Sequence, residues 1–351
     1  MDKYIIGLMS GTSLDGLDII YVRFNSENIT NYSILSTETY QYDDYWRQQL
    51  NNAYHFSASD LYRLDAAYGF FLGKKVLEFI HKNNIKQVDL ISSHGQTIFH
   101  NPEESFTTQI GNGAYINAIT KIKTISDFRT QDMALGGQGA PLVPIGDQVL
   151  FGSYQYCLNI GGFANVSFEK NQQRIAFDIC PANIVLNYYA KKLEKTYDEN
   201  GNIARSGKLI PELLKELNNI SFYKEEKPKS LGWEFVESEV IPLIKKNAYN
   251  ISDILHTYTE HIAIQIAKRT GKGKMLITGG GAHNQYLVSQ IKKYSSADII
   301  IPDKTIIDFK EALIFALLGL LREQNKINIL ASVTGSEIDH SSGVIYNAYK
   351  K

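Results

Sequence analysis

The first third of the chain alternates between strand-like and helix-like patterns of apolar residues. Short apolar-rich runs separated by polar, turn-forming residues predict a meander of strands: 4–9, 17–24 and 31–39. Apolar residues then recur every three or four positions from 57 to 82, which predicts a helix capped by Ser57 or Ser59. A strand, a short helix and a strand are expected next: 88–92, 113–120 and 123–126. This part of the chain is therefore predicted to be mixed α/β.

The second half repeats this layout about 150 residues later. Three strand-like runs again form a meander, and glycines again lie at its first turn: 156–160, 166–169 and 174–177. Helices and further strands are expected after it: helices 208–218, 252–269, 285–294 and 310–324, and strands 274–278 and 298–301. The two halves share little sequence identity, so the similarity is one of layout, as an ancient duplication would leave. A chain of 351 residues is also long for a single core, and two domains are expected.

The segment 127–144 has no apolar periodicity and contains three glycines and two prolines. It is the expected crossover between the domains. It also carries Asp127, Arg129 and Asp132, which a linker alone would not require. We predict a first domain over 1–135, to which the segment 325–351 returns, and a second domain over 136–324.

Composition excludes several classes of protein. The chain is 44% hydrophobic and 21% charged with a net charge of −1, which is globular and gives no reason to expect a nucleic-acid or membrane partner. Cys157 and Cys180 lie in apolar surroundings without metal-ligand spacing, so both are expected to be reduced and buried. Met1 leads directly into a predicted strand, so no signal peptide is expected, and no apolar run reaches membrane-spanning length. A cytoplasmic location is predicted.

The turn between the first two strands has the residues of a phosphate-binding loop. It combines two glycines, which allow a close approach of backbone N–H groups to a ligand, with hydroxyls and carboxylates. These residues are Ser10, Gly11, Thr12, Ser13, Asp15, Gly16 and Asp18. Asp15 is the candidate ligand for Mg²⁺, directly or through water. Taken alone, the turn is equally compatible with an ordinary polar hairpin.

Similar glycine turns recur later in the chain. Gly161, Gly162 and Asn165 lie at the first turn of the second meander, and Gly279–Gly281 directly follow a predicted strand. The common nucleotide motifs are absent: there is no Gly-x4-Gly-Lys-Ser/Thr, no complete dinucleotide loop and no protein-kinase signature. A nucleotide is therefore not expected to bind through any of these common loops.

The motifs in this chain resemble those of the anhydro-N-acetylmuramic acid kinases. These are sugar kinases of the actin, hexokinase and Hsp70 ATPase superfamily. Seven matching segments occur in the order of the family: Gly7–Asp18, Ser93–Thr97, Asp127–Arg129, Gly136–Pro144, Asn159–Val166, Thr278–Asn284, and Glu311-Ala312 with Ser332–Gly335. Each segment alone is weak evidence, but seven in order are specific, and together they cover nearly the whole chain.

The resemblance implies a fold and a set of functional residues. The fold is α/β, with two actin-like ATPase (ribonuclease H-like) domains, each a mixed five-stranded sheet with helices, around a central cleft. Asp178 matches the catalytic base. ATP would be held by both hairpins and the triple glycine: Gly11, Thr12, Ser13, Asp15, Gly16, Asp18, Gly161, Gly162, Asn165, Gly279, Gly280 and Gly281. The sugar would be held by His94, Gln96, Asp127, Arg129, Asn183 and Glu311. ATP and Mg²⁺ are the implied cofactors, and a homodimer is the implied assembly.

Each of the main residues also has a purely structural interpretation. Asp178 lies three residues before Pro181, where we expect a helix to begin, so it could be a helix cap. Arg129 could form an ion pair between domains rather than bind an anion. Glu311 could be favoured at a helix N-terminus, and His94 could orient a loop.

The implied reaction is a hydrolytic phosphorylation of 1,6-anhydro-N-acetylmuramic acid in peptidoglycan recycling. Water adds at C1 and the γ-phosphoryl group goes to O6, which requires a base and charge neutralisation at the phosphates. Two alternatives stay open: a nucleotide or polyphosphate hydrolase on the same fold, and a non-catalytic sugar-sensing protein. The chain departs from the family at Ile179–Ala182, where two glycines are replaced, and at Leu231 and Trp233, where threonine and arginine are usual. These departures concern the choice of substrate and the rate of turnover more than the fold.

Overall fold

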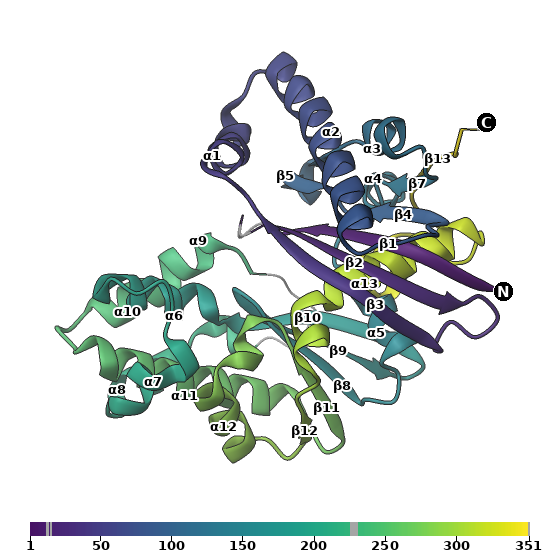
Figure 1. The fold of residues 1–351 in the computed structure, drawn as a ribbon. Coiled ribbons are helices and arrows are strands. Elements are labelled where there is room, and N and C mark those ends of the chain that lie inside the picture. The colour runs from purple at the N-terminus through teal and green to yellow at the C-terminus, as the bar shows by residue number, and fades with distance from the viewer. Residues whose placement is uncertain (12–13, 15, 225–230, 350–351) are drawn as a thin grey trace. The chain divides into compact units, whose positions relative to one another are not determined.

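The structure is a computed structural model that describes residues 1–11, 14, 16–224 and 231–349. The chain divides into two compact units. Unit 1 consists of Met1–Leu150 and Phe309–Lys351, and unit 2 is the continuous segment Phe151–Asp308. Each unit contains its own sheet (Figure 1). Within the described ranges, no helix is both long and apolar enough to span a membrane.

The sheet of unit 1 has six strands in the order β13-β7-β4-β1-β2-β3. Their bounds are β1 Asp2–Ser10, β2 Gly16–Asn25, β3 Tyr32–Gln41, β4 Leu90–Ser93, β7 Thr124–Ser126 and β13 Val344–Tyr346. The first three strands pair antiparallel, and β4 and β7 continue the sheet in parallel beside β1. Unit 1 also contains a separate hairpin and several helices besides α13: β5 Gln96–Asn101, β6 Phe106–Ile110, α1 Asp44–Asn52, α2 Ala58–Lys82, α3 Gly113–Thr120, α4 Thr130–Ala134, α5 Val143–Leu150 and α14 Ala331–Thr334.

Helix α2 forms for the reasons that its sequence pattern predicts. The side chain of Ser57 accepts a hydrogen bond from the Asp60 N–H at 3.2 Å, so Ser57 is its N-cap. Its apolar positions at helical spacing, including Leu64, Leu72 and Phe79, are buried in the core of unit 1. The helix predicted over 57–82 is confirmed.

The C-terminal part of the chain returns to unit 1 through the long helix α13 (Lys304–Glu323). A Cβ added to Gly7 in β1 would lie 2.3 Å from the Ala312 carbonyl oxygen, so only glycine allows this helix to lie so close to the strand. The Ser92 hydroxyl in β4 donates a hydrogen bond to the Phe315 carbonyl at 2.5 Å. The helix therefore completes the core of unit 1 against β1 and β4.

The observed division into units differs from the predicted one. The sequence placed 1–135 and 325–351 in the first domain and 136–324 in the second. The observed boundaries follow Leu150 and Asp308. The physical reason lies in α5 and α13, which pack together inside unit 1. Gly146 lies against Ile314, and Lys310 Nζ forms a buried ion pair with Asp147 Oδ1 at 2.9 Å.

The sheet of unit 2 has five strands in the order β10-β9-β8-β11-β12. Their bounds are β8 Tyr156–Ile160, β9 Phe163–Lys170, β10 Gln173–Pro181, β11 Lys274–Thr278 and β12 Asp298–Ile300. The main helices are α6 Asn183–Ala190, α7 Asn202–Ser206, α8 Pro211–Asn218, α9 Trp233–Phe235, α10 Ile241–Lys245, α11 Ile251–Arg269 and α12 Gln285–Tyr294. Three antiparallel strands followed by two parallel ones repeat the order of unit 1. The predicted actin-like fold class is confirmed, except that β13 adds a sixth strand to the first sheet.

Several elements were not predicted. The hairpin β5–β6 and helices α1, α4 and α5 are built from segments of only five to nine residues, which are too short for periodicity alone to identify. The helix expected to begin at Pro181 begins instead at Asn183, because Pro181 is the last residue of β10.

Candidate active site

The first hairpin of unit 1 is described only in part. Thr12, Ser13 and Asp15, including the predicted metal ligand, lie outside the described residues. Gly16 must be glycine for packing, since a Cβ there would lie 2.6 Å from the Tyr40 carbonyl oxygen. Asp18 is partly buried, and its Oδ1 accepts a hydrogen bond from Thr39 Oγ1 at 2.5 Å.

A row of buried hydroxyls supports the end of β1 where this hairpin begins. Ser10 Oγ lies 2.7 Å from the hydroxyl of Tyr68, which lies 2.5 Å from that of Tyr42. All three residues are buried in unit 1. The hydroxyl chain connects the base of the hairpin to α2.

Arg129 and His94 form the most specific side-chain contact among the predicted sugar-binding residues. His94 Nε2 lies 3.1 Å from Arg129 Nε and 2.8 Å from Arg129 Nη2. Arg129 Nη1 donates to the Gly139 carbonyl oxygen at 2.5 Å. Burial and the Arg129 charge lower the pKa of His94 to about 3, whereas burial lowers the pKa of Arg129 to about 10. At neutral pH His94 is neutral and Arg129 is charged.

Glu311 lies near this pair, on the part of α13 that belongs to unit 1. Burial raises the pKa of its carboxyl, while the charges of Lys310 and Arg129 oppose that increase. The neighbouring Lys310 is paired with Asp147, and both side chains are 4% exposed. The charges of Glu311 and Asp132 in turn oppose the lowering of the Arg129 pKa.

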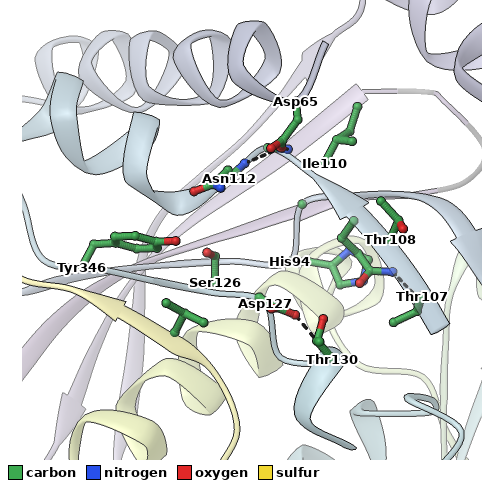
Figure 2. A pocket seen from close by; sticks show the side chains of 14 residues that line it. Asp65, His94, Thr107, Thr108, Ile110, Asn112, Ser126, Asp127, Thr130 and Tyr346 are labelled. Atoms are coloured by element: carbon green, nitrogen blue, oxygen red, sulfur yellow. Dashed lines mark hydrogen bonds between the residues drawn. The ribbon is translucent and has the colours of Figure 1, made fainter. Parts of the chain in front are cut away.

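Unit 1 also contains a small polar cavity of about 200 Å³ at the ends of β4 and β7 (Figure 2). Asp65 lies at one side, where its Oδ1 accepts hydrogen bonds from the backbone N–H groups of Gly111 and Asn112 at 2.7 and 2.9 Å. Other polar side chains that line the cavity are His94, Thr107, Thr108, Gln109, Asn112, Ser126, Asp127, Thr130 and Tyr346. The lining is rich in groups that donate or accept hydrogen bonds.

Asp127 lies at this cavity in an unusual backbone conformation. Its φ is +56°, in the left-handed region that residues other than glycine rarely adopt. Its Oδ1 accepts a hydrogen bond from the Thr130 N–H at 3.2 Å. Strained backbone of this kind is most common at functional sites. Gln96, by contrast, is 2% exposed, and its Oε1 is buried.

In unit 2 the strand register aligns four polar residues in one row. Asp178 pairs with Asn165, Asn165 with Asn159, and Asn159 with Thr278. Residues paired directly across neighbouring strands point to the same face of a sheet. Asp178 and Asn165 are therefore neighbours on one face, next to the turn at Gly161 and Gly162.

The Asp178 carboxylate is held by a backbone group. Its Oδ2 accepts a hydrogen bond from the Leu231 N–H at 2.8 Å. Burial raises the pKa of Asp178 to about 6, and this hydrogen bond limits the increase. Helix α6 has Ala182 as its N-cap, and no described side chain caps it. The capping interpretation of Asp178 is therefore wrong.

The glycines of unit 2 fall into two groups. A Cβ added to Gly279 or Gly281 would lie 2.5 Å from Asn159 Oδ1 or 2.3 Å from Ile160 Cγ2, so these two glycines are needed for packing. A Cβ at Gly161, Gly162 or Gly280 would meet nothing closer than 3.6 Å. The fold itself does not require glycine at these three positions.

The β8–β9 turn leaves a backbone donor available. The Gly162 carbonyl accepts hydrogen bonds from the Ala182 and Ile184 N–H groups at 2.7 and 3.1 Å, and Asn183 Nδ2 donates to the Ile160 carbonyl at 3.2 Å. The Gly162 N–H donates to no described residue, and the residue is exposed. This is the geometry of a turn that offers an N–H group to an anion.

Comparison with known proteins decides the family. The model of the family described as anhydro-N-acetylmuramic acid kinase matches residues 3–348. An anhydro-N-acetylmuramic acid kinase from Aliivibrio fischeri is 35% identical over 99% of this chain and 100% of its own length. One from Vibrio vulnificus is 32% identical over 97% of each chain. The chain belongs to the anhydro-N-acetylmuramic acid kinase family.

Solved structures outside the kinase family are more distant. Component A of the (R)-2-hydroxyglutaryl-CoA dehydratase of Acidaminococcus fermentans is 16% identical, covers 92% of this chain and 99% of its own, and has a TM-score of 0.49.

The structure brings some of the predicted site residues together within each unit. In unit 1, His94 contacts Arg129, and Glu311 lies close enough to Arg129 for the two charges to interact. In unit 2, Asp178 and Asn165 are adjacent in the sheet, and Asn183 binds the end of β8 beside Gly161. Within the described ranges, no group of three or more His, Cys, Asp or Glu residues is arranged to hold a metal ion.

Four further residues that build the cavity with His94 and Asp127 were not predicted from the sequence. Asp65 lies on α2, Ser126 on β7 and Tyr346 on β13, and Asn112 is the N-cap of α3. Asn112 had a recognisable signal, because an asparagine directly before a helix is a favoured N-cap, and its side chain accepts from the Ala114 N–H at 2.9 Å. Asp65 had none, since an acidic residue on an amphipathic helix is ordinary.

Proposed function

We propose that this protein is an ATP-dependent kinase of 1,6-anhydro-N-acetylmuramic acid that works in peptidoglycan recycling. The C1–O6 bond of the anhydro ring breaks, the oxygen of water bonds to C1, and O6 takes the γ-phosphoryl group of ATP. The products are N-acetylmuramic acid 6-phosphate, ADP and the proton that water loses. A cytoplasmic location and a homodimer are part of the proposal.

The observation that carries the proposal is the state of Asp178. A general base works best when its pKa lies near the working pH and its carboxylate is held in place. Burial raises the pKa of Asp178 to about 6, and the Leu231 N–H fixes one of its oxygens. We propose that Asp178 accepts the proton of the attacking water while Asn165 lies beside it.

We propose that ATP binds at the glycine turns, with Mg²⁺ bound to its phosphates. The unpartnered Gly162 N–H fits an anionic phosphate, and the open surroundings of Gly161 and Gly280 leave space beside the backbone. Gly11, Gly16 and Asp18 would supply the first hairpin, together with Thr12, Ser13 and Asp15. When bound, Mg²⁺ would neutralise phosphate charge, and Asp15 is the proposed ligand.

We propose that the sugar binds unit 1 at Arg129 and the neighbouring polar cavity. Arg129 stays charged at neutral pH and binds no described carboxylate directly. It suits the acid group of the substrate. The polar side chains of the cavity, including Asp127, suit sugar hydroxyls and the N-acetyl group. Gln96 and Glu311 would contribute to the same site, and Asn183 is the proposed sugar-binding residue of unit 2.

The pH dependence of the reaction should reflect Asp178. The pKa of Asp178 is raised to about 6, so the base is protonated and inactive below that pH and ionised above it. We expect kcat/KM to fall about tenfold per pH unit below 6 and to be level above about 7. His94 and Arg129, with pKa values of about 3 and 10, do not titrate in this range.

The control for this profile is Glu311→Gln, because burial also raises the pKa of Glu311. The decrease near pH 6 should persist in that variant. A profile that stays level down to pH 4.5, or a decrease that disappears in Glu311→Gln, would contradict the assignment to Asp178.

The function itself is tested by following ADP formation with ATP and Mg²⁺, with and without the anhydro sugar. We expect ADP only when sugar is present, and mass spectrometry of product made in ¹⁸O-water should show one phosphate and one ¹⁸O atom. Equal ADP formation without sugar would indicate a nucleotide hydrolase. Absence of ADP in both reactions would indicate a non-catalytic sugar-binding protein.

A further inference from the structure

The Nε2 atom of His94 is engaged by Arg129 and is therefore not available to a ligand. Two N–H groups of Arg129 point at His94 Nε2, at 3.1 and 2.8 Å, so this nitrogen is an acceptor and the ring proton lies on Nδ1. His94 is 5% exposed and its Nδ1 is buried. Its ring packs against that of Phe315, with centroids 4.6 Å apart. The ring is therefore enclosed by protein.

The guanidinium of Arg129 is fixed by uncharged acceptors. Nε and Nη2 donate to His94, and Nη1 donates to the Gly139 carbonyl. Of the five N–H donors of an arginine, two remain, one on Nη1 and one on Nη2. Two such neighbouring donors match the two oxygens of a carboxylate. No carboxylate of a described residue binds Arg129 directly, so these two donors are available to a ligand. The charges of Glu311 and Asp132 act on the guanidinium without such a contact.

We propose that His94 is a positioning residue that acts through Arg129 on the carboxylate of the sugar. This inference rests on the proposed function and refines it, since it assigns His94 to the acid group of the substrate rather than to the ring hydroxyls. His94 sets the rotation of the guanidinium about its long axis, and the Gly139 carbonyl fixes the opposite side. The free edge with Nη1 and Nη2 then faces the substrate acid.

The test compares two ligands, 1,6-anhydro-N-acetylmuramic acid and 1,6-anhydro-N-acetylglucosamine, which lacks the acid side chain. Calorimetry gives Kd for both, and KM and kcat are measured for the first. His94→Phe keeps an aromatic ring and removes the acceptor. His94→Gln keeps an acceptor close to the position of Nε2. Arg129→Gln removes the charge, and His81→Gln, on an exposed turn at the end of α2, is the matched control.

We expect His94→Phe to weaken binding of the acidic sugar about ten- to a hundredfold, mainly through KM, since misplacing a binding group by about 1 Å costs up to about a hundredfold. The neutral sugar should lose much less. His94→Gln should recover most of the affinity, and the double variant His94→Phe with Arg129→Gln should bind the acidic sugar no more weakly than Arg129→Gln alone. An equal loss for both sugars, or additive losses in the double variant, would overturn the positioning role.

A second measurement does not depend on any variant folding. Nitrogen NMR of the histidines in the parent protein should show His94 as the Nδ1–H tautomer, without titration between pH 5 and 8. A proton on Nε2 would overturn the inference. If the parent protein binds the acidic sugar no better than the neutral one and forms no phosphorylated product, the proposed function fails instead, which is a distinct result.

Discussion

Replacing Asp178 with asparagine is expected to lower kcat about a hundred- to ten-thousandfold, the usual contribution of a general base. The asparagine oxygen still accepts the Leu231 N–H, so the 2.8 Å contact that holds the side chain is retained. What is lost is the ability to take a proton from water. Binding of ATP and sugar, measured by calorimetry, should stay within a few-fold of the parent protein.

The stability of this variant provides its control. The pKa of Asp178 is raised from 3.8 to about 6 in the folded protein, so ionisation opposes folding and stability falls as the pH rises from about 4 to 6. Asparagine removes that cost. At pH 7.5 the melting temperature of Asp178→Asn should equal or exceed that of the parent. Turnover within a few-fold of the parent would show that Asp178 is not the base, and Asp127, Asp132 and Glu311 would be the next candidates.

Valine at Gly162 or Gly280 is expected to weaken ATP binding on the order of a hundredfold while leaving the fold intact. A Cβ at Gly162 would lie 3.7 Å from Ile184 Cβ, and one at Gly280 would lie 3.8 Å from Asn183 Nδ2, both ordinary contacts. The added side chain would instead occupy the space beside the backbone where we propose that the nucleotide lies. A displacement of about 1 Å is enough for a loss of this size. Calorimetry with a non-hydrolysable ATP analogue measures it.

Gly281→Ala is the matched contrast for these two variants. Its Cβ would lie 2.3 Å from Ile160 Cγ2 and 2.7 Å from Ile160 Cβ, so we expect a lower melting temperature, with overpacking costing about 1–3 kcal/mol. If Gly162→Val and Gly280→Val bind the analogue as tightly as the parent, the proposed nucleotide site is wrong. If they unfold as readily as Gly281→Ala, their effect on binding says nothing specific about ATP.

The glycine turns changed in these variants illustrate which parts of the site follow from sequence patterns and which do not. Glycine turns after strands predict close backbone approach, and the strand meanders follow from short apolar runs, so both meanders and their turns were predictable. The sequence cannot separate Gly280, whose surroundings are open, from Gly279 and Gly281, which pack against β8. That distinction depends on contacts between strands that are far apart in the chain.

The contacts of the proposed site residues could likewise not be predicted from sequence patterns. The Leu231 N–H that binds Asp178 lies 53 residues further along the chain, and His94 lies 35 residues before Arg129. Backbone groups such as this N–H leave no signature in the residue type. For the same reason, leucine at a position where the family tends to have threonine leaves this hydrogen bond in place.

The substituted loop after Asp178 is also less disruptive than its sequence suggests. Ala182 has a φ of −124°, which residues with side chains adopt, and Cys180 is not among the positions with positive φ. Ile179, Cys180 and Ala182 are buried in the core of unit 2. The larger side chains at these positions therefore add apolar packing beneath the base.

The arrangement of unit 1 has a consequence for synthesis of the chain. Unit 2 is continuous, and all of its residues leave the ribosome before most of α13 does. Unit 1 needs α13 against β1 and β4, where Gly7 meets Ala312 and Ser92 bonds to Phe315. At about 5–20 residues per second, the first strands wait many seconds for this partner. The segment made first is thus completed last, and until then its apolar surface stays uncovered, which is the condition that favours aggregation during synthesis.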